Sequence, residues 1–136
     1  MIRFAATLMI ASVMMSSRND EHLTTVEKRY GDGALMSVRT YRDGKEEGIH
    51  RGYWPGGALK FEYRYHNGLS EGVQREWFED GSPFTEFHYV KGHEAGLQRM
   101  WTSYGKLRAN YVVKNGRRYG LIGAMGCRGD SAVSSR

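Results

Sequence analysis

The sequence predicts an all-β protein, an elongated antiparallel meander of consecutive β-hairpins. Glycines return along the chain at a constant step of 24 residues. Between them apolar and polar residues alternate with a period of two, which places successive side chains on opposite faces of a strand. The 136 residues include 18 glycines but only two prolines, which fits tight turns between short strands. A hydrophobic content of 40% also excludes a fully disordered chain.

The clearest unit of this pattern runs from Tyr53 to Glu76. A short strand ends on Tyr53, and Pro55–Gly56–Gly57 then reverses the direction of the chain. Segment 59–66 alternates apolar with polar residues and predicts a second strand. Asn67–Gly68 closes the unit, because Asn and Gly tolerate the positive φ that tight hairpin turns require.

Three glycine positions of this unit recur four times each, and a period of this size indicates an array of supersecondary units. They are Gly33, Gly57, Gly81 and Gly105; Gly44, Gly68, Gly92 and Gly116; and Gly48, Gly72, Gly96 and Gly120. The units span residues 24–47, 48–71, 72–95 and 96–119. Leu121 starts a fifth unit that is not completed. With two strands in each unit, we expect about eight strands in one sheet.

The two ends of the chain do not follow the period. In residues 1–17, Arg3 is followed by a mostly apolar run from Phe4 to Met15, which is shorter than the ~20 residues needed to span a bilayer. These residues predict a signal peptide or an uncleaved N-terminal anchor, with a buried N-terminal segment as the alternative. We expect residues 18–23 to be a linker, 24–126 the repeat domain and 127–136 a disordered tail.

The net charge of +5 and the pI near 9.4 favour an acidic partner or an anionic membrane surface. The excess is modest, and we expect no nucleic-acid partner. The single cysteine, Cys127, allows neither an internal disulfide nor a cysteine-based zinc site. The five histidines share no register, so no metal site or other cofactor is expected. Without a nucleophile, phosphate-loop or zinc motif, the sequence predicts a protein that is not an enzyme.

Aromatic residues dominate the predicted sheet, and they form the candidate binding surface. They are Tyr53, Tyr63, Tyr65, Trp77, Phe87, Tyr89, Trp101 and Tyr111. No segment has the pattern of an amphipathic helix that could cover them. The sheet must therefore curl on itself, form a homodimer or offer its aromatic face to a partner, because contiguous exposed aromatic surface usually marks a contact site.

Arg51, Arg75 and Arg99 are in register and share the side of their strands with Tyr53, Trp77 and Trp101. One interpretation is a row of guanidinium groups that contacts phosphates or carboxylates. The other is that each arginine packs over a ring in a cation–π contact. The carboxylates Glu62, Glu76, Glu79 and Glu86 are expected on a solvated face beside Lys60 and Arg64.

The pattern resembles the bacterial variant of the MORN repeat over about residues 28–122. The resemblance is carried by the segments YWPGGALKFEYRYHNGLSEG, WFEDGSPFTEFHYVKGHEAG and YGKLRANYVVKNGRRYG. It implies elongated sheets of β-hairpins that serve in protein scaffolding and phospholipid contact. Proteins of this kind are often described as antitoxins of the YwqK type, and many look like exported lipoproteins.

These observations predict a protein-interaction scaffold that is exported to the periplasm or cell envelope and binds a protein through its aromatic face. An alternative is a cytoplasmic antitoxin that holds a toxin on the same face. A third hypothesis is peripheral membrane binding, in which Arg51, Arg75 and Arg99 contact lipid headgroups.

Overall fold

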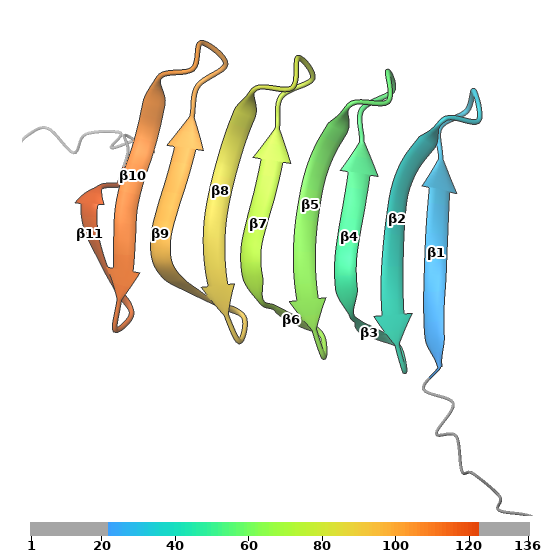
Figure 1. Ribbon diagram of the computed structural model, residues 1–136, viewed down its shortest axis with the longest axis horizontal. Helices are drawn as coiled ribbons and strands as arrows, with labels where there is room; N and C mark the ends of the chain where they lie inside the picture. Colours follow the sequence, from blue (N-terminus) through green and yellow to red (C-terminus); the bar gives the residue numbers. More distant parts are fainter. Residues whose placement is uncertain (1–21, 123–136) are drawn as a thin grey trace, which may run out of the picture.

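A computed structural model describes residues 22–122 and confirms the predicted fold class, an antiparallel β-meander in one sheet (Figure 1). The strands in sheet order are β1 (Leu23–Arg29), β2 (Leu35–Arg42), β4 (Gly48–Tyr53), β5 (Leu59–His66), β7 (Gly72–Trp77), β8 (Pro83–Val90), β9 (His93–Trp101), β10 (Leu107–Lys114) and β11 (Arg117–Leu121). Two short strands lie off this path: β3 (Lys45–Glu46) pairs with β2, and β6 (Leu69–Ser70) pairs with β5.

The sheet has 11 strands, more than the expected eight or so. In the first two units the strand that follows the Asp-Gly or Asn-Gly turn is interrupted, so the short strands β3 and β6 are separate from β4 and β7. In the third unit the equivalent residues form one continuous strand, β9. Strand β11 begins in the fourth unit, at Arg117, and ends at Leu121, where the incomplete fifth unit starts. At the other end Leu23, which we placed in the linker, is the first residue of β1.

The turns at one end of the sheet have the backbone geometry that the Asn-Gly pattern predicted. Asn67 and Gly68 have φ values of 51° and 81°, and positive φ at both central residues is typical of type I′ hairpin turns. Positive φ recurs 24 residues earlier and later, at Asp43 and at Lys91. Lysine is an unusual residue in this conformation, because its Cβ is crowded there.

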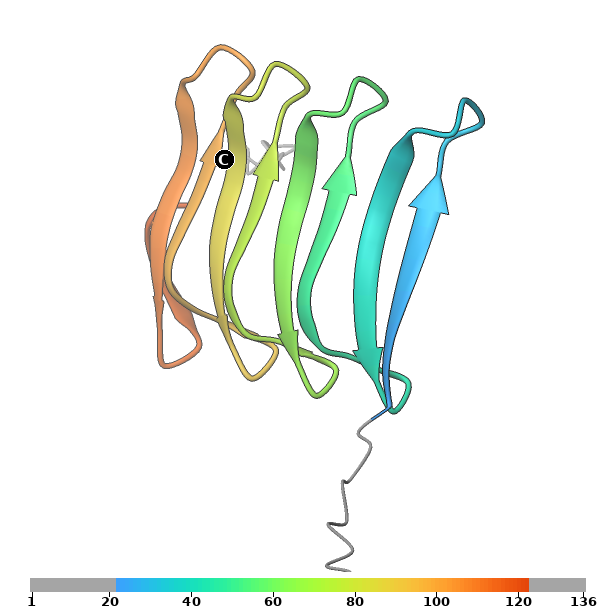
Figure 2. The same ribbon diagram turned by 45° about the vertical axis from the view of Figure 1, so that its right-hand side comes forward.

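The turns at the opposite end are three-residue loops. The amide of Gly57 donates to the carbonyl of Trp54 over 2.8 Å, and the Trp54 amide donates to the Ala58 carbonyl over 2.8 Å. The same pair of bonds closes the loops that follow Tyr30, Phe78 and Thr102. Because both kinds of turn recur at the same step, successive hairpins lie side by side with their turns aligned at the two ends of the sheet (Figure 2).

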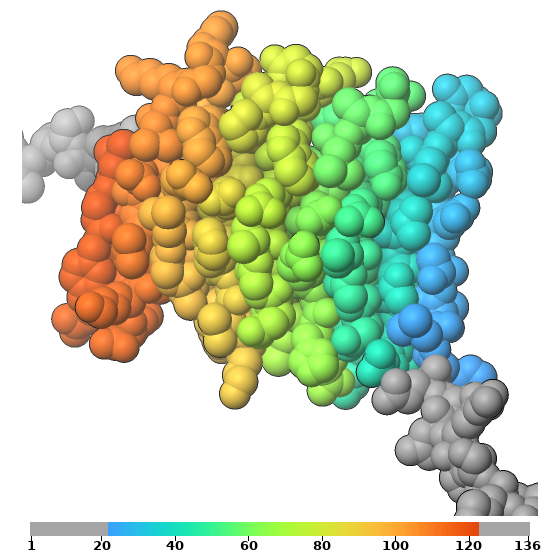
Figure 3. All heavy atoms as spheres, viewed as in Figure 1, coloured from blue at the N-terminus to red at the C-terminus, as the bar shows by residue number. Residues whose placement is uncertain are grey.

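Within residues 22–122 the protein is one layer thick. Successive strands cover the face shown in Figure 3 in sequence order, and no other described segment crosses them. The only hydrophobic residues of this part that are buried are Ala109, Tyr111 and Val113, all on β10. Residues 22–122 include no helix with the length and apolar character that a membrane crossing needs.

The strand register divides the side chains between two faces. Gln74 lies opposite Phe87 and Tyr63 opposite His50, and we call the side that carries them the groove face. Arg51 lies opposite Glu62, and we call that side the charged face. Cross-strand partners share a face, and successive residues along each strand point alternately to the groove face and to the charged face.

Residues 1–21 and 123–136 lie outside the described part of the chain. The signal peptide or anchor over 1–17, most of the 18–23 linker, and the tail over 127–136 with Cys127 therefore stay predictions.

Candidate functional site

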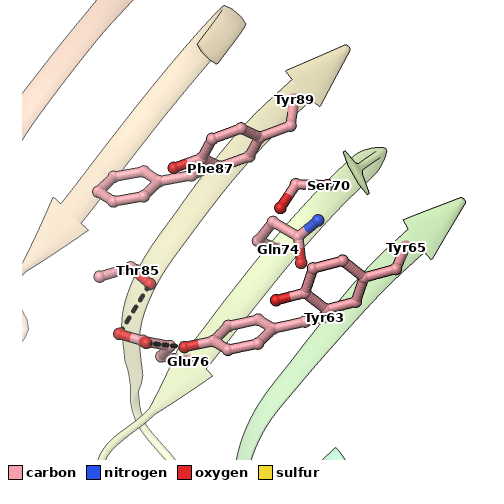
Figure 4. A pocket seen from close by; sticks show the side chains of 8 residues that line it. All are labelled: Tyr63, Tyr65, Ser70, Gln74, Glu76, Thr85, Phe87 and Tyr89. Carbon is pink, nitrogen blue, oxygen red and sulfur yellow. Dashed lines mark hydrogen bonds between the residues drawn. The ribbon is translucent and has the colours of Figure 1, made fainter. Parts of the chain in front are cut away.

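An aromatic groove lies on the groove face over β5, β7 and β8, with a volume of about 280 Å³ (Figure 4). It is lined by Tyr63, Tyr65, Ser70, Gln74, Glu76, Thr85, Phe87 and Tyr89. Four of these are aromatic residues that the sequence predicted for the binding surface. The period of two explains how they meet: alternate residues of each strand point to one side, and the register brings the three strands together.

Glu76 is the only carboxylate that lines the groove, and it is held from two strands. The Tyr63 hydroxyl on β5 donates a hydrogen bond to Oε1 of Glu76. The Thr85 hydroxyl on β8 donates to Oε2 over 3.2 Å (Figure 4). Each carboxylate oxygen can accept more than one hydrogen bond, so both keep acceptor capacity toward the groove.

Burial raises the pKa of the Tyr63 phenol above its ordinary value, and the hydrogen bond to Glu76 and its negative charge raise that pKa further. Burial also raises the pKa of Tyr89 across the groove. Both phenols therefore keep their protons at neutral pH. The Tyr63 hydroxyl remains a hydrogen-bond donor, and the groove gains no negative charge besides that of Glu76.

The floor of the groove is held by Gln74, which is 6% exposed. Its Oε1 accepts a hydrogen bond from the Arg64 amide over 2.9 Å, and its Nε2 donates to the Arg64 carbonyl over 2.7 Å. Gln98 binds the backbone of His88 in the same manner, and the His50 ring lies 2.7 Å from the Thr40 carbonyl.

This row of buried polar side chains was not predicted from the sequence. Its signal is present, because His50, Gln74 and Gln98 follow each other at the period of the repeat. Each of them binds the backbone of a residue in the preceding strand. These side chains support the ladder where the chain departs from regular pairing.

A more apolar pocket of about 330 Å³ adjoins the groove at the end of the sheet and shares Tyr63 and Glu76 with it. Phe78 and Phe84 form one wall, with ring centroids 4.9 Å apart. At the other wall, Lys60 Nζ lies 4.4 Å from the centroid of the Trp54 ring. The groove and the pocket are therefore adjacent, and most of the residues that line them are aromatic.

The eight residues of the predicted aromatic face do not form one surface. Tyr63, Tyr65, Phe87 and Tyr89 line the groove, whereas Tyr111 is buried at 6% exposure farther along the same face. These five residues are among the eight predicted positions. The prediction of a single face combined residues from both phases of the strand alternation, and its role in binding stays a prediction.

The remaining three predicted aromatics lie at the ends of alternate strands, two residues after the arginines. Trp101 stands on the charged face, where the Arg99 guanidinium lies 5.3 Å from its ring centroid. Tyr53 and Trp77 occupy the equivalent positions at the ends of β4 and β7. None of the three lines the groove, but Trp77 lines the adjoining apolar pocket.

The predicted row of arginines alternates with carboxylates across five strands. Arg51, Glu62, Arg75, Glu86 and Arg99 are successive cross-strand partners on β4, β5, β7, β8 and β9. Arg51 Nε donates to Glu62 over 2.9 Å, and Arg75 Nε donates to Glu86 over 3.1 Å. Arg99 also bonds to Glu86. Each of the three guanidinium groups therefore has a carboxylate partner.

Glu62 and Glu86 lie on the charged face, only 16% and 19% exposed at the side chain. The Arg99 hydrogen bond lowers the pKa of Glu86 against the opposing effect of burial, and Arg75 lowers it further. Glu76 does not share this face. The expectation that it belongs to a solvated charged face was wrong, because it stands one residue out of phase with its neighbour Arg75.

No group of three or more histidine, cysteine, aspartate or glutamate side chains in residues 22–122 is arranged to hold a metal ion.

Searches of this chain against protein-family models, curated proteins and solved structures find no match. The resemblance to the MORN-variant family therefore stays a prediction that rests on the repeated residues alone.

Proposed function

We propose that this protein is a binding scaffold, and that it holds a partner protein against the groove over β5, β7 and β8. The observation that carries the proposal is the position of the groove: it opens on one face of a single sheet, and every strand of residues 22–122 belongs to that sheet, so no second layer of strands or helices from this part of the chain covers it. Tyrosine supplies three of its rings. Tyrosine is enriched at protein interfaces, because it joins a large apolar area to a polar hydroxyl.

The rigidity of the surface supports the same proposal. The groove residues stand on strands of the sheet, and Gln74 and Glu76 are tied by hydrogen bonds to neighbouring strands. A site that is already ordered loses little conformational entropy when a partner binds. We therefore expect the backbone of the groove to change little on binding.

The proposed place of action is the cell envelope, on the basis of the signal-like residues 1–17. An antitoxin would use the same surface in a different compartment. Headgroup binding by Arg51, Arg75 and Arg99 is less well supported, since each guanidinium already has a carboxylate partner. We do not propose it as a function.

Site-specific photo-crosslinking in intact cells tests the proposal. The photoreactive residue p-benzoylphenylalanine replaces either Tyr89, in the groove, or its neighbour His88, which the alternation places on the charged face. We expect a discrete adduct from position 89 that is absent from position 88 and disappears when excess unlabelled protein competes. Equal adducts from both positions, or none from position 89, would contradict the proposal. Mass spectrometry of the adduct distinguishes a toxin from an envelope protein.

A further inference from the structure

Two arginines of the chain itself lie over aromatic rings on the groove face, one on each side of the groove. Toward β1, the Arg39 guanidinium lies 5.8 Å from the centroid of the Phe61 ring. Toward β11, the Arg118 guanidinium lies 5.2 Å from the centroid of the Tyr111 ring. Attraction between a cation and an aromatic face accounts for both contacts.

The second of these contacts includes a carboxylate. Arg118 donates to Glu94 through Nη2 over 2.9 Å and through Nε over 3.2 Å. The Tyr111 hydroxyl also donates to Glu94, over 3.4 Å. A guanidinium, a carboxylate and a tyrosine therefore form one cluster, in which the cation lies over the ring and the phenol shares its carboxylate.

The groove has two of these three parts. Tyr63 donates to Glu76 as Tyr111 does to Glu94, and further rings stand beside them (Figure 4). The lining of the groove includes no lysine or arginine. Lys60 lines only the adjoining pocket, where its Nζ lies over the Trp54 ring, so the part that is missing from the groove itself is the cation.

We propose that the groove receives an arginine side chain of the bound partner, whose guanidinium pairs with Glu76 and lies against the tyrosine rings. This inference rests on the proposed function, because the arginine belongs to the partner protein. It requires the partner to present a basic segment at the point of contact, although this protein itself carries a net charge of +5.

Guanidinium fits this groove better than an ammonium group does. It is planar, so it stacks on an aromatic ring, and its forked N–H groups bind both oxygens of one carboxylate. Glu76 holds both oxygens in place through Tyr63 and Thr85 and keeps acceptor capacity on each. A quaternary ammonium headgroup could stack on the rings, but it has no N–H to donate to the carboxylate.

A peptide titration of the full-length protein tests this inference. The probe is the peptide Ac-Gly-Ser-Arg-Ser-Gly-NH₂, and its control carries citrulline, a neutral group of the same shape, in place of arginine. Backbone amide shifts of β7 and β8 measured by NMR report the binding. We expect the citrulline peptide to bind on the order of tenfold more weakly, since a charge-assisted hydrogen bond is lost. Equal affinity for the two peptides would overturn the inference.

A pair of matched variants locates the binding. Glu76→Gln keeps the shape of the side chain and removes its charge. We expect this variant to bind the arginine peptide on the order of tenfold more weakly than the wild type does. Glu62→Gln is the control, because Glu62 is a carboxylate on the charged face of the adjacent strand. We expect that variant to bind as the wild type does. Equal losses in the two variants, or no loss in Glu76→Gln, would overturn the inference.

Two further outcomes separate this inference from the proposed function. If the adduct from position 89 forms but the arginine peptide does not bind, the inference that the partner supplies an arginine is wrong and the scaffold proposal stands. If neither is observed, both proposals fail. Binding of phosphocholine vesicles in place of the arginine peptide, with the same dependence on Glu76, would assign the groove to a lipid headgroup and overturn the inference.

Discussion

The side chain of Gln98 binds both backbone polar groups of His88. The His88 amide donates to Oε1 of Gln98 over 3.0 Å, and Nε2 of Gln98 donates to the His88 carbonyl over 2.8 Å. The pairing of β8 with β9 is irregular at this position, so His88 has no backbone partner on β9. A carboxamide thus takes the place of a strand–strand pair, and it is fully buried.

We expect Gln98→Leu to lower the free energy of unfolding by about 1–3 kcal/mol, because it leaves the part-buried amide and carbonyl of His88 without these partners. Urea denaturation measures the loss. Gln98→His is the matched variant: the repeat carries His50 at this register, where its ring contacts one carbonyl. It should lose less than Gln98→Leu does. Equal stability of Gln98→Leu and the wild type would show that the hydrogen bonds contribute nothing.

Gly52 allows the Phe61 ring to lie directly against the backbone of β4. A Cβ at position 52 would be 2.0 Å from Cε1 of that ring. Gly52→Ala must therefore displace Phe61, and we expect it to cost about 1–3 kcal/mol of unfolding free energy. Because Phe61 stacks on Tyr63, with centroids 4.6 Å apart, amide shifts around the groove should change as well.

Gly56→Ala is the control for that substitution, because a Cβ at Gly56 meets no atom within 4 Å. We expect its thermal denaturation midpoint to stay close to that of the wild type. A large loss in both variants would assign the effect to glycine itself rather than to contact with Phe61.

Lys91 occupies a hairpin turn with a φ of 48°, in a region that asparagine tolerates better. We expect Lys91→Asn to raise the free energy of unfolding by roughly 0.5–1 kcal/mol, because the strain is relieved while the backbone is kept. The Lys91 amide, which donates to Glu71 over 2.7 Å, is unchanged by the substitution. Lys91→Ala keeps the strain and should have no such effect. Equal urea denaturation midpoints for Lys91→Asn and Lys91→Ala would refute the explanation by backbone strain at position 91.

Stability should fall in acid through Glu86. The pKa of Glu86 is lowered in the folded protein from its ordinary value of 4.5 by the Arg99 hydrogen bond and then by Arg75. A lowered folded pKa means that the stabilisation is fully present above pH 4.5 and is lost as the pH falls through the folded value. Glu86→Gln should therefore flatten the acid side of the stability profile.

Unfolding free energies measured from about pH 7 to about pH 3 test this prediction. Part of the acid dependence should persist in the variant, because the pKa values of Glu47 and Asp80 are also lowered by hydrogen bonds, mainly from the Asn67 amide and the Ser82 hydroxyl. An acid profile of Glu86→Gln parallel to that of the wild type would rule out the Glu86 contribution.

Export predicts a mature N-terminus near residues 17–20. N-terminal sequencing of the protein from fractionated cells measures it. Recovery of intact Met1 in the cytoplasmic fraction would contradict export and favour the antitoxin alternative.

The amino-acid sequence by itself determined the architecture, because the features that encode it are local. Asn67–Gly68 adopts its turn through the φ preferences of two adjacent residues, and the alternation over 59–66 assigns each side chain of that strand to a face. The same two signals at a period of 24 residues are sufficient to build the meander.

Only the tertiary structure decided what the surface contains. Tyr63 meets Glu76 through the register between β5 and β7, two strands that pair directly at only two positions and are otherwise joined through Gln74. Alternation gives the face of each residue but not its neighbour on the next strand, since that neighbour depends on long-range pairing and on where the ladder is interrupted. For this reason the hairpins could be predicted from the sequence, whereas the groove and its carboxylate could not.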